Sequence, residues 1–262
     1  MKRNMYLTGW LLLGIWLLNA CKSSEKTTAA ALPALSAAEI LKRAVAAAGG
    51  DTWQRPQTLV LQGTADFFPD GRQDMKMHFD KYAMYRVYPP ENDEAHKANG
   101  RVRFDAAEGD SVFFKLAFDG KTSSTYLAPK AKPYEKHFAW SNNFGFGIIR
   151  FADSPGFRLD LLANDQVEGF PCYFIQITDP KQSKTLFAID AKNFYIRMVG
   201  FDTEVGYHYR IYSDFKQAPN VSFLQPTRVR LYFEGAKWMD IHWKQFAVNQ
   251  PIDPQVFVAA GK

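Results

Sequence analysis

Cysteine is scarce in this sequence, with only 2 among 262 residues. A small fold that depends on several disulfides is therefore excluded, because two cysteines form one bridge at most. The two residues are Cys21 and Cys172. Cys172 lies between Pro171 and Tyr173 in an apolar run, which predicts a buried, unreactive thiol.

Metal-binding and catalytic patterns are also missing. The five histidines are His78, His96, His137, His208 and His242. They form no closely spaced pair such as H-x-x-x-H, so the sequence predicts neither a metal site nor a cofactor. His208, Asp214 and Ser222 come nearest to a nucleophilic triad, but they lie on no recognisable nucleophile turn. We therefore expect no catalytic residues, and an enzyme is the less favoured alternative.

Positive charge is not concentrated in any one segment. The formal net charge is +5, and Lys2 and Arg3 contribute two of these charges, which leaves +3 for residues 21–262. Because no cluster of Lys and Arg stands out, we expect no nucleic acid as a partner. The mild basic balance favours anionic lipid headgroups instead.

The longest uncharged apolar run lies within the first 20 residues. Lys2 and Arg3 precede a stretch over residues 5–18 that is shorter than the roughly 20 residues of a spanning helix. This pattern is typical of a secretory signal peptide over residues 1–20. The segment 18–21, Leu-Asn-Ala-Cys, resembles the bacterial lipobox. That resemblance implies that the Cys21 thiol carries a diacylglycerol after cleavage. An uncleaved anchor and an ordinary signal peptide are the alternatives.

Residues 21–35 follow as a lipidated cysteine and a polar, aperiodic tether. Residues 36–262 then form the single domain that we expect. Lys22 stands where some lipoproteins carry the Asp that retains them in the inner membrane. The resemblance therefore implies a lipid-anchored protein of the cell envelope, at the outer membrane and facing the periplasm.

One helix is predicted at the start of the domain. Ser36 and Glu39 have the spacing of a capping box, and apolar residues then recur at helical spacing up to Ala48. Gly49 and Gly50 end the pattern, as glycine does at helix C-termini. The apolar stripe consists mostly of alanine, which suits close packing against a curved sheet.

From Thr58 onward the apolar period changes from 3.6 to 2, which indicates strands. Pro69-Asp70-Gly71 predicts the turn of a first hairpin, and Asp119-Gly120 predicts another. Residues 134–151 are aromatic and irregular, with a short helix and a loop expected there. The sequence thus predicts a mainly β domain, a meander of about ten or eleven antiparallel strands that must curl.

A curled meander has a concave face, and its apolar positions are the candidate ligand-binding residues. They are Met75, Met77, Phe79, Tyr85, Phe114, Leu116, Phe118, Tyr173, Ile175, Ile177, Val229, Leu231, Phe233, Ile241 and Trp243. The covers available are the first helix and residues 134–151. With so few covers, this face is either a packed core or a cavity for an apolar ligand, and the residues alone leave both open.

Several local motifs resemble the LolA/LolB-like superfamily of envelope carriers, the outer membrane lipoprotein-sorting proteins. They lie in the same order as in that family and span nearly all of the domain. The segments are residues 46–53, 58–63, 118–121 (Phe-Asp-Gly-Lys), 167–173, 212–215, 225–226 and 246–257 (ending V-N-Q-P-I-D-P-Q-V-F). None of them is a catalytic signature.

This resemblance implies a half-open β-barrel of about eleven strands with helices across its concave face. It also implies that the domain binds acyl chains of a lipid or lipoprotein, for carriage or sensing, while the Cys21 lipid holds it to the membrane. The alternative is a non-catalytic scaffolding lipoprotein with a filled core and an envelope protein partner.

Overall fold

A computed structural model describes residues 32–143 and 145–258 of the chain. The predicted signal peptide, Cys21 and most of the tether lie outside these described residues. The chain divides into two compact units, Met1–Leu32 and Pro33–Lys262, and every element below belongs to the second. Within the described ranges, no helix is long and apolar enough to cross a bilayer.

The predicted first helix is confirmed as α1, Ala37–Ala48. The Ser36 side chain accepts a hydrogen bond from the Glu39 backbone N–H at 3.2 Å, as expected of an N-cap. The Glu39 carboxylate does not close the capping box; it pairs with Arg43 one turn later, at 2.8 Å. Gly49 ends the helix with φ +133°, and a Cβ there would lie 2.1 Å from the Ser222 carbonyl oxygen.

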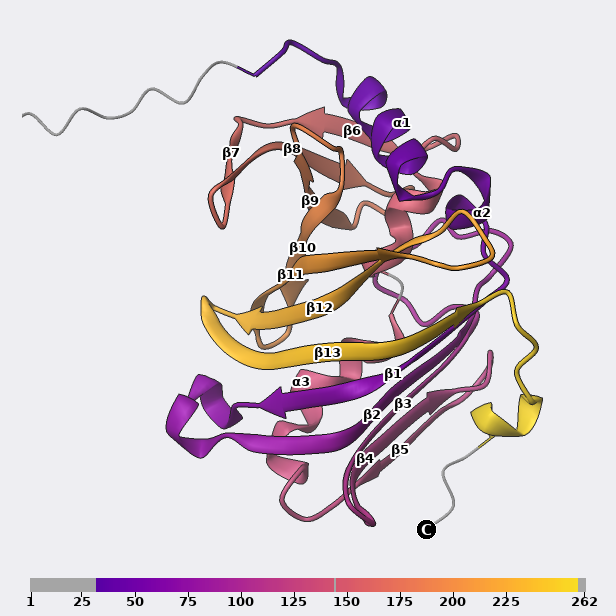
Figure 1. The fold of residues 1–262 in the computed structure, drawn as a ribbon, viewed down its shortest axis with the longest axis vertical. Coiled ribbons are helices and arrows are strands. Elements are labelled where there is room, and N and C mark those ends of the chain that lie inside the picture. The colour runs from indigo at the N-terminus through magenta and orange to yellow at the C-terminus, as the bar shows by residue number, and fades with distance from the viewer. Residues whose placement is uncertain (1–31, 144, 259–262) are drawn as a thin grey trace, which may run out of the picture. The chain divides into compact units, whose positions relative to one another are not determined.

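Thirteen antiparallel strands form one curved sheet that does not close into a barrel (Figure 1). The order is β5-β4-β3-β2-β1-β13-β12-β11-β10-β9-β8-β6, with β7 beside β8. The strands are β1 Thr58–Phe67, β2 Met77–Val87, β3 Arg101–Glu108, β4 Ser111–Phe118, β5 Ser123–Leu127, β6 Arg158–Leu161, β7 Asp165–Val167, β8 Phe170–Thr178, β9 Lys184–Asp190, β10 Ile196–Thr203, β11 Gly206–Gln217, β12 Leu224–Phe233 and β13 Ala236–Val248. The predicted open antiparallel meander is confirmed, with two more strands than expected because β6 and β7 are short.

The sheet consists of two meanders joined through its middle. Strands β1 to β5 follow one another outward, and β6 to β13 return until β13 pairs with β1. The register slips at Gly63 against both β13 and β2. A Cβ on Gly63 would lie 1.9 Å from the His242 carbonyl oxygen, so glycine permits this close crossing. Such irregularities bend a sheet and produce its curvature.

The same slip changes which residues of β2 face inward. Phe79 is buried, Asp80 and Lys81 are both exposed, and the next buried residue is Tyr82. Strict alternation from Phe79 would place Tyr85 inside. Instead Met84 is buried, and Tyr85 is half-buried on the other face.

Twelve of the fifteen residues predicted on the concave face are buried, and three lie elsewhere. Besides Tyr85, the exceptions are Met75 and Met77. Met75 is 40% exposed in a 3-10 turn, η2 (Gln73–Met75), before the strand begins. Met77 is half-buried as the first residue of β2. The hairpin of β1 and β2 is therefore confirmed, but its second strand starts later than predicted.

Residues 132–143 and 145–151, the crossing segment, cover the inner face between the two meanders. It comprises η3 (Lys132–Tyr134), α3 (Glu135–Phe138), η4 (Ala139–Asn142) and η5 (Gly145–Phe151). α3 lies behind β1 and β13 in the view of Figure 1. Ring contacts fix it to strands of both meanders. They join Tyr134 to Phe67 (5.3 Å between centroids), Phe138 to Phe114 (4.8 Å), His137 to Trp238 (4.1 Å) and Trp140 to His208 (4.3 Å).

Helix α1 covers the other end of the inner face, beside β6 and β12. Its buried side chains are Ile40, Leu41, Ala44 and Ala48. Just before it, the Pro33 carbonyl accepts a hydrogen bond from the Tyr173 hydroxyl at 3.1 Å. The expectation of helices across the concave face is thus confirmed.

Candidate ligand cavity

A cavity of about 170 Å³ lies between the inner face of the sheet and the crossing segment. Its sheet wall comes from β1, β2, β3, β10, β11, β12 and β13, and its other walls from α1, the short helix α2 (Asp51–Gln54), η4 and η5. The apolar part of the lining includes Trp53, Leu61, Met84, Phe104, Val229, Ile241 and Trp243. Its volume is similar to the roughly 150 Å³ cavities that hold a benzene-sized molecule.

Three of the predicted ligand-binding residues line this cavity, namely Val229, Ile241 and Trp243. Three others, Phe114, Leu231 and Phe233, surround a void of only about 10 Å³ below α3 and η4, where aromatic rings fill the space. The remaining buried ones pack in the core away from both. They are Phe79, Leu116, Phe118, Tyr173, Ile175 and Ile177. The inner face is thus a filled core at its ends and hollow in its middle.

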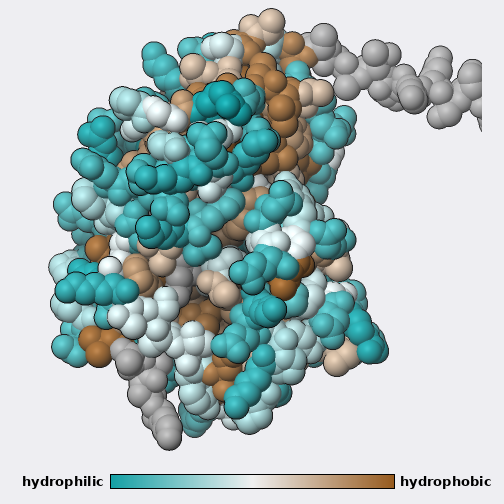
Figure 2. Space-filling view, turned by 180° about the vertical axis from the view of Figure 1, so that it is seen from behind, coloured by the Kyte–Doolittle hydropathy of each residue, from teal (hydrophilic) through white to brown (hydrophobic). Residues whose placement is uncertain are grey.

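The outer surface offers no comparable apolar area on the side opposite to Figure 1. Figure 2 shows this side as mostly hydrophilic, with hydrophobic side chains gathered only in small patches.

Three arginines on the cavity wall escaped the sequence-based prediction: Arg86, Arg150 and Arg210. Arg86 and Arg150 are each only 8% exposed. Arg86 follows Met84 on the inner face of β2, and Arg210 lies between His208 and Tyr212 on β11. The positions of Arg86 and Arg210, two residues from other inward-facing residues of their strands, could have indicated that they face the cavity. Arginine, however, is normally assigned to the solvent-exposed face of a strand.

Aromatic rings stack against two of these guanidinium groups. The Arg150 Cζ lies 3.9 Å from the centroid of the Trp53 ring. The Arg210 Cζ lies 3.4 Å from the centroid of Phe146 and 4.5 Å from that of Trp140, both in the crossing segment. These cation–π contacts connect the crossing segment and α2 to the charged wall.

Burial shifts the pKa of all three arginines downward. Burial, together with the positive charges of Arg150 and Arg210, lowers the pKa of Arg86 to about 10, opposed by Tyr88. Burial likewise lowers the pKa of Arg210 to about 10, opposed by its hydrogen bond with Tyr212. The pKa of Arg150 falls for the same reason, opposed by Tyr88. Arginine side chains stay protonated in proteins at neutral pH, so the cavity wall is positively charged.

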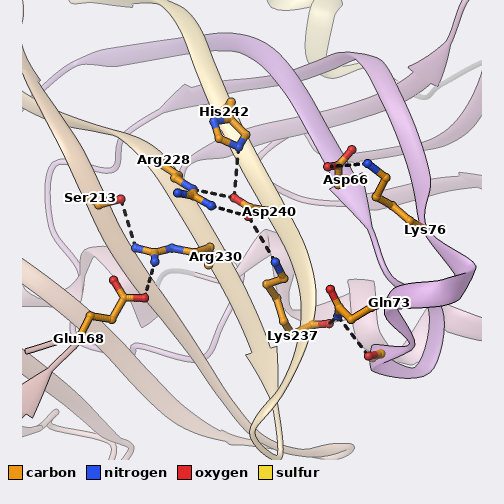
Figure 3. A network of polar contacts seen from close by, with 11 residues as sticks. Asp66, Gln73, Lys76, Glu168, Ser213, Arg228, Arg230, Lys237, Asp240 and His242 are labelled. Carbon is orange, nitrogen blue, oxygen red and sulfur yellow. Dashed lines mark hydrogen bonds and ion pairs between the residues drawn. The ribbon is translucent and has the colours of Figure 1, made fainter.

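Two arginines on the outer face of β12, by contrast, have acidic partners (Figure 3). Arg228 donates to both carboxylate oxygens of Asp240, at 3.0 and 2.9 Å, and Arg230 pairs with Glu168. In the part of the chain that the structure describes, no carboxylate forms an ion pair with Arg150 or Arg210. Among the described residues, Arg150 and Arg210 therefore differ from Arg228 and Arg230 in lacking an anionic partner.

A second, polar cleft of about 840 Å³ adjoins the cavity, and Arg150 lines both. Its wall carries charges of both signs, including Arg55, Glu91, Asp93 and Asp153. The Gln54 side chain spans part of it and donates to the Arg150 carbonyl at 3.1 Å and to Asp153 at 3.0 Å. Arg150 thus lies at the boundary between a polar and a mainly apolar space.

The three groups considered for a catalytic triad lie in different surroundings. His208 is fully buried; its Nδ1 lies 2.9 Å from the Tyr232 carbonyl oxygen, and its Nε2 accepts from Arg210 at 3.4 Å. Asp214 and Ser222 are exposed. Within residues 32–143 and 145–258, no group of three His, Cys, Asp or Glu side chains could hold a metal ion. The predicted burial of Cys172 is confirmed, and burial raises the pKa of its thiol to about 11.

No family profile matches this sequence, and no curated protein matches it either. Solved structures do share its fold. A domain from Vibrio parahaemolyticus named for outer membrane lipoprotein sorting aligns with a TM-score of 0.52 at 10% identity, covering 85% of this chain and 97% of that one. A DUF1329 family protein from Desulfovibrio piger gives 0.55 at 12% identity, with 84% and 96% covered. A LolA superfamily protein from Nitrosomonas europaea gives 0.51 at 14% identity, with 86% and 98% covered.

These structures confirm the predicted LolA-like fold for this chain. At such low identity the likeness concerns the fold, because one fold supports many functions.

Proposed function

We propose that this protein is a lipid-anchored envelope protein that binds the acyl chain of a lipid or lipoprotein in the central cavity. The observation that carries this proposal is the hollow middle of an otherwise well-packed inner face. Leu61, Val229 and Ile241 give this space an apolar wall, and burial of an acyl chain there stabilises the complex by about 0.8 kcal/mol per CH₂. The shared fold with a domain named for lipoprotein sorting supports the same function.

Anchoring belongs to the same proposal. A diacylglycerol on Cys21 holds the domain at the outer membrane, facing the periplasm. Residues 22–35 form a tether that lets the domain extend away from the bilayer. We infer that the protein carries or senses this lipid or lipoprotein and does not catalyse a reaction.

Uptake of a longer chain requires the crossing segment to move, because about 170 Å³ holds only a short part of an acyl chain. Trp140 and Phe146 hold this segment by stacking on His208, Phe201 and Arg210. Such ring contacts are worth about 1 kcal/mol each beyond the burial of the rings, and opening would also expose the buried side chains of Ile148 and Ile149.

Solvent extraction of the purified full chain tests this function. The protein is held in a non-ionic amphipol so that detergent does not compete, and the extract is analysed by mass spectrometry. We expect non-covalent lipid at a stoichiometric ratio, and displacement of a neutral fluorophore such as N-phenyl-1-naphthylamine by added fatty acid. An extract without lipid, together with no fluorophore binding by a folded protein, would favour a scaffolding protein instead.

A further inference from the structure

We propose that the ligand of this cavity is an anionic amphiphile, whose carboxylate or phosphate group binds between Arg150 and Arg210 while its single acyl chain lies along Leu61, Val229 and Ile241. This inference rests on the proposed function and specifies its ligand class. Three features of the described residues carry it: the charge of the wall, the free donors of Arg150, and the position of these donors relative to the apolar lining.

The positive charge of the cavity wall favours an anionic ligand. Burying a cation is costly unless it is paired, and the outer arginines of β12 are paired with Asp240 and Glu168. Among the described residues, Arg150 and Arg210 have aromatic and hydroxyl partners but no carboxylate. A ligand that brings one negative charge would replace the missing partner, whereas a neutral ligand would leave the wall uncompensated.

Arg150 also has donors with nothing to accept them. Its Nε and Nη1 are buried and have no hydrogen-bond partner in the described part of the chain. Buried donors of this kind are rare in native proteins and call for an explanation. The guanidinium group donates through its edge in a fork that fits carboxylate and phosphate oxygens.

Stacking does not account for these donors. Trp53 lies over the face of the Arg150 guanidinium group, and Phe146 lies over that of Arg210. A ring on the face leaves the N–H groups in the plane available. The arginines can therefore hold α2 and the crossing segment through their faces and an anion through their edges at once.

The position of the donors fits an amphiphile. Arg150 borders the polar cleft as well as the apolar cavity, whose opposite wall carries Val229, Ile241 and Trp243. A head group at Arg150 therefore leaves its chain on the apolar side. Tyr82 on β2 and Tyr212 on β11 also line the cavity, and Tyr212 is hydrogen-bonded to Arg210.

The test compares ligands that share one chain and differ in the head group: decanoate, decyl phosphate, 1-decanol and decyltrimethylammonium. Each displaces N-phenyl-1-naphthylamine from the full chain in non-ionic amphipol at pH 7.5. Because hydrogen bonds to charged groups are stronger than neutral ones, we expect at least one anion to bind about 10-fold to 100-fold tighter than decanol. The cation should bind worst. Preference for decanoate would identify a fatty-acid carboxylate, and preference for decyl phosphate a phospholipid-type head group.

Variants then assign this preference to the arginines. Arg150→Met and Arg210→Met should each weaken the preferred anion by about 10-fold or more and leave decanol unchanged or tighter. Arg150→Lys, which keeps the charge, should retain part of the affinity. Arg72→Met is the matched control, because Arg72 is exposed, forms an ion pair with Asp74 and is not a lining residue of the cavity.

Equal binding of decanol and both anions by the wild-type protein would overturn the inference and leave the proposed function standing, and this comparison does not depend on whether a variant folds. An equal loss of decanol and anion in the arginine variants would show that the arginines only hold the crossing segment. Binding of none of the four ligands would refute the proposed function and the inference with it.

Discussion

Filling the cavity from its sheet wall should make the ligand-free protein more stable and less able to bind. Val229 lies near the middle of β12, paired with Tyr212 on one side and Ile241 on the other, and it is a lining residue. Val229→Phe adds four carbon atoms and directs them into the hollow space. The matched control is Val199→Phe, the same change at a fully buried residue of β10 that is not among the residues lining this cavity.

The magnitude follows from the cavity volume. Empty apolar space costs about 24 cal/mol per Å³, so about 170 Å³ corresponds to an upper limit of about 4 kcal/mol. Phenylalanine fills part of this space, and after some strain we expect a gain of about 1 kcal/mol in the free energy of unfolding. Val199→Phe should instead lose about 1–3 kcal/mol, because it adds volume to a packed core.

Ligand binding should change in the opposite direction. The new ring takes the place of about four CH₂ groups, at about 0.8 kcal/mol each, so decanoate should bind roughly 100-fold more weakly. Urea unfolding measures the stability and fluorophore displacement measures the affinity. The reasoning would be refuted if Val229→Phe destabilised the protein as much as Val199→Phe does, or if decanoate bound it as tightly as the wild type.

Three further outcomes are expected. Burial lowers the pKa of His208 well below its usual value, so below about pH 6.5 the unfolded chain binds more protons than the folded one. The free energy of unfolding should therefore fall by about 1 kcal/mol per pH unit on acidification. In urea titrations, His208→Gln should show a shallower dependence of this free energy on pH. Gly63→Ala places a Cβ 1.9 Å from the His242 carbonyl oxygen and should destabilise the sheet by about 3 kcal/mol in the same assay, whereas an unaffected midpoint would contradict the close crossing. Cys21→Ala should abolish incorporation of radiolabelled palmitate and release the protein from the membrane fraction; retained label would show that Cys21 is not the acylated residue.

The sequence predicted the elements whose local signals agree with the final packing. Ser36 and Gly49 bound α1 as expected, and the turn at residues 69–71 connects the first hairpin. The slip at Gly63 was not predictable, because a glycine in an alternating strand has no side chain to show which face it occupies. This slip makes Met84 an inner residue and Tyr85 an outer one.

The candidate site was predicted only in part for a related reason. Val229, Ile241 and Trp243 were found because they are apolar and alternate with polar residues. Arg86 and Arg210 occupy equivalent inner positions, but hydropathy patterns assign a charge to the solvent side. Arg150 lies in a segment without period, so only the three-dimensional structure brings it to the same wall.

The pairing of β1 with β13 has a consequence for how the chain folds. Leu59 lies opposite Val248, so the two strands that hold the meanders together come from nearly opposite ends of the domain. Closing so long a loop is entropically costly and makes folding slow. During synthesis, the edge of β1 that pairs with β13 stays unpaired until β13 is complete, and this unpaired edge can pair with a wrong strand. Loss of β13 would therefore separate the two meanders and open the cavity along its centre, so the integrity of the ligand site depends on a strand that is made after the other twelve.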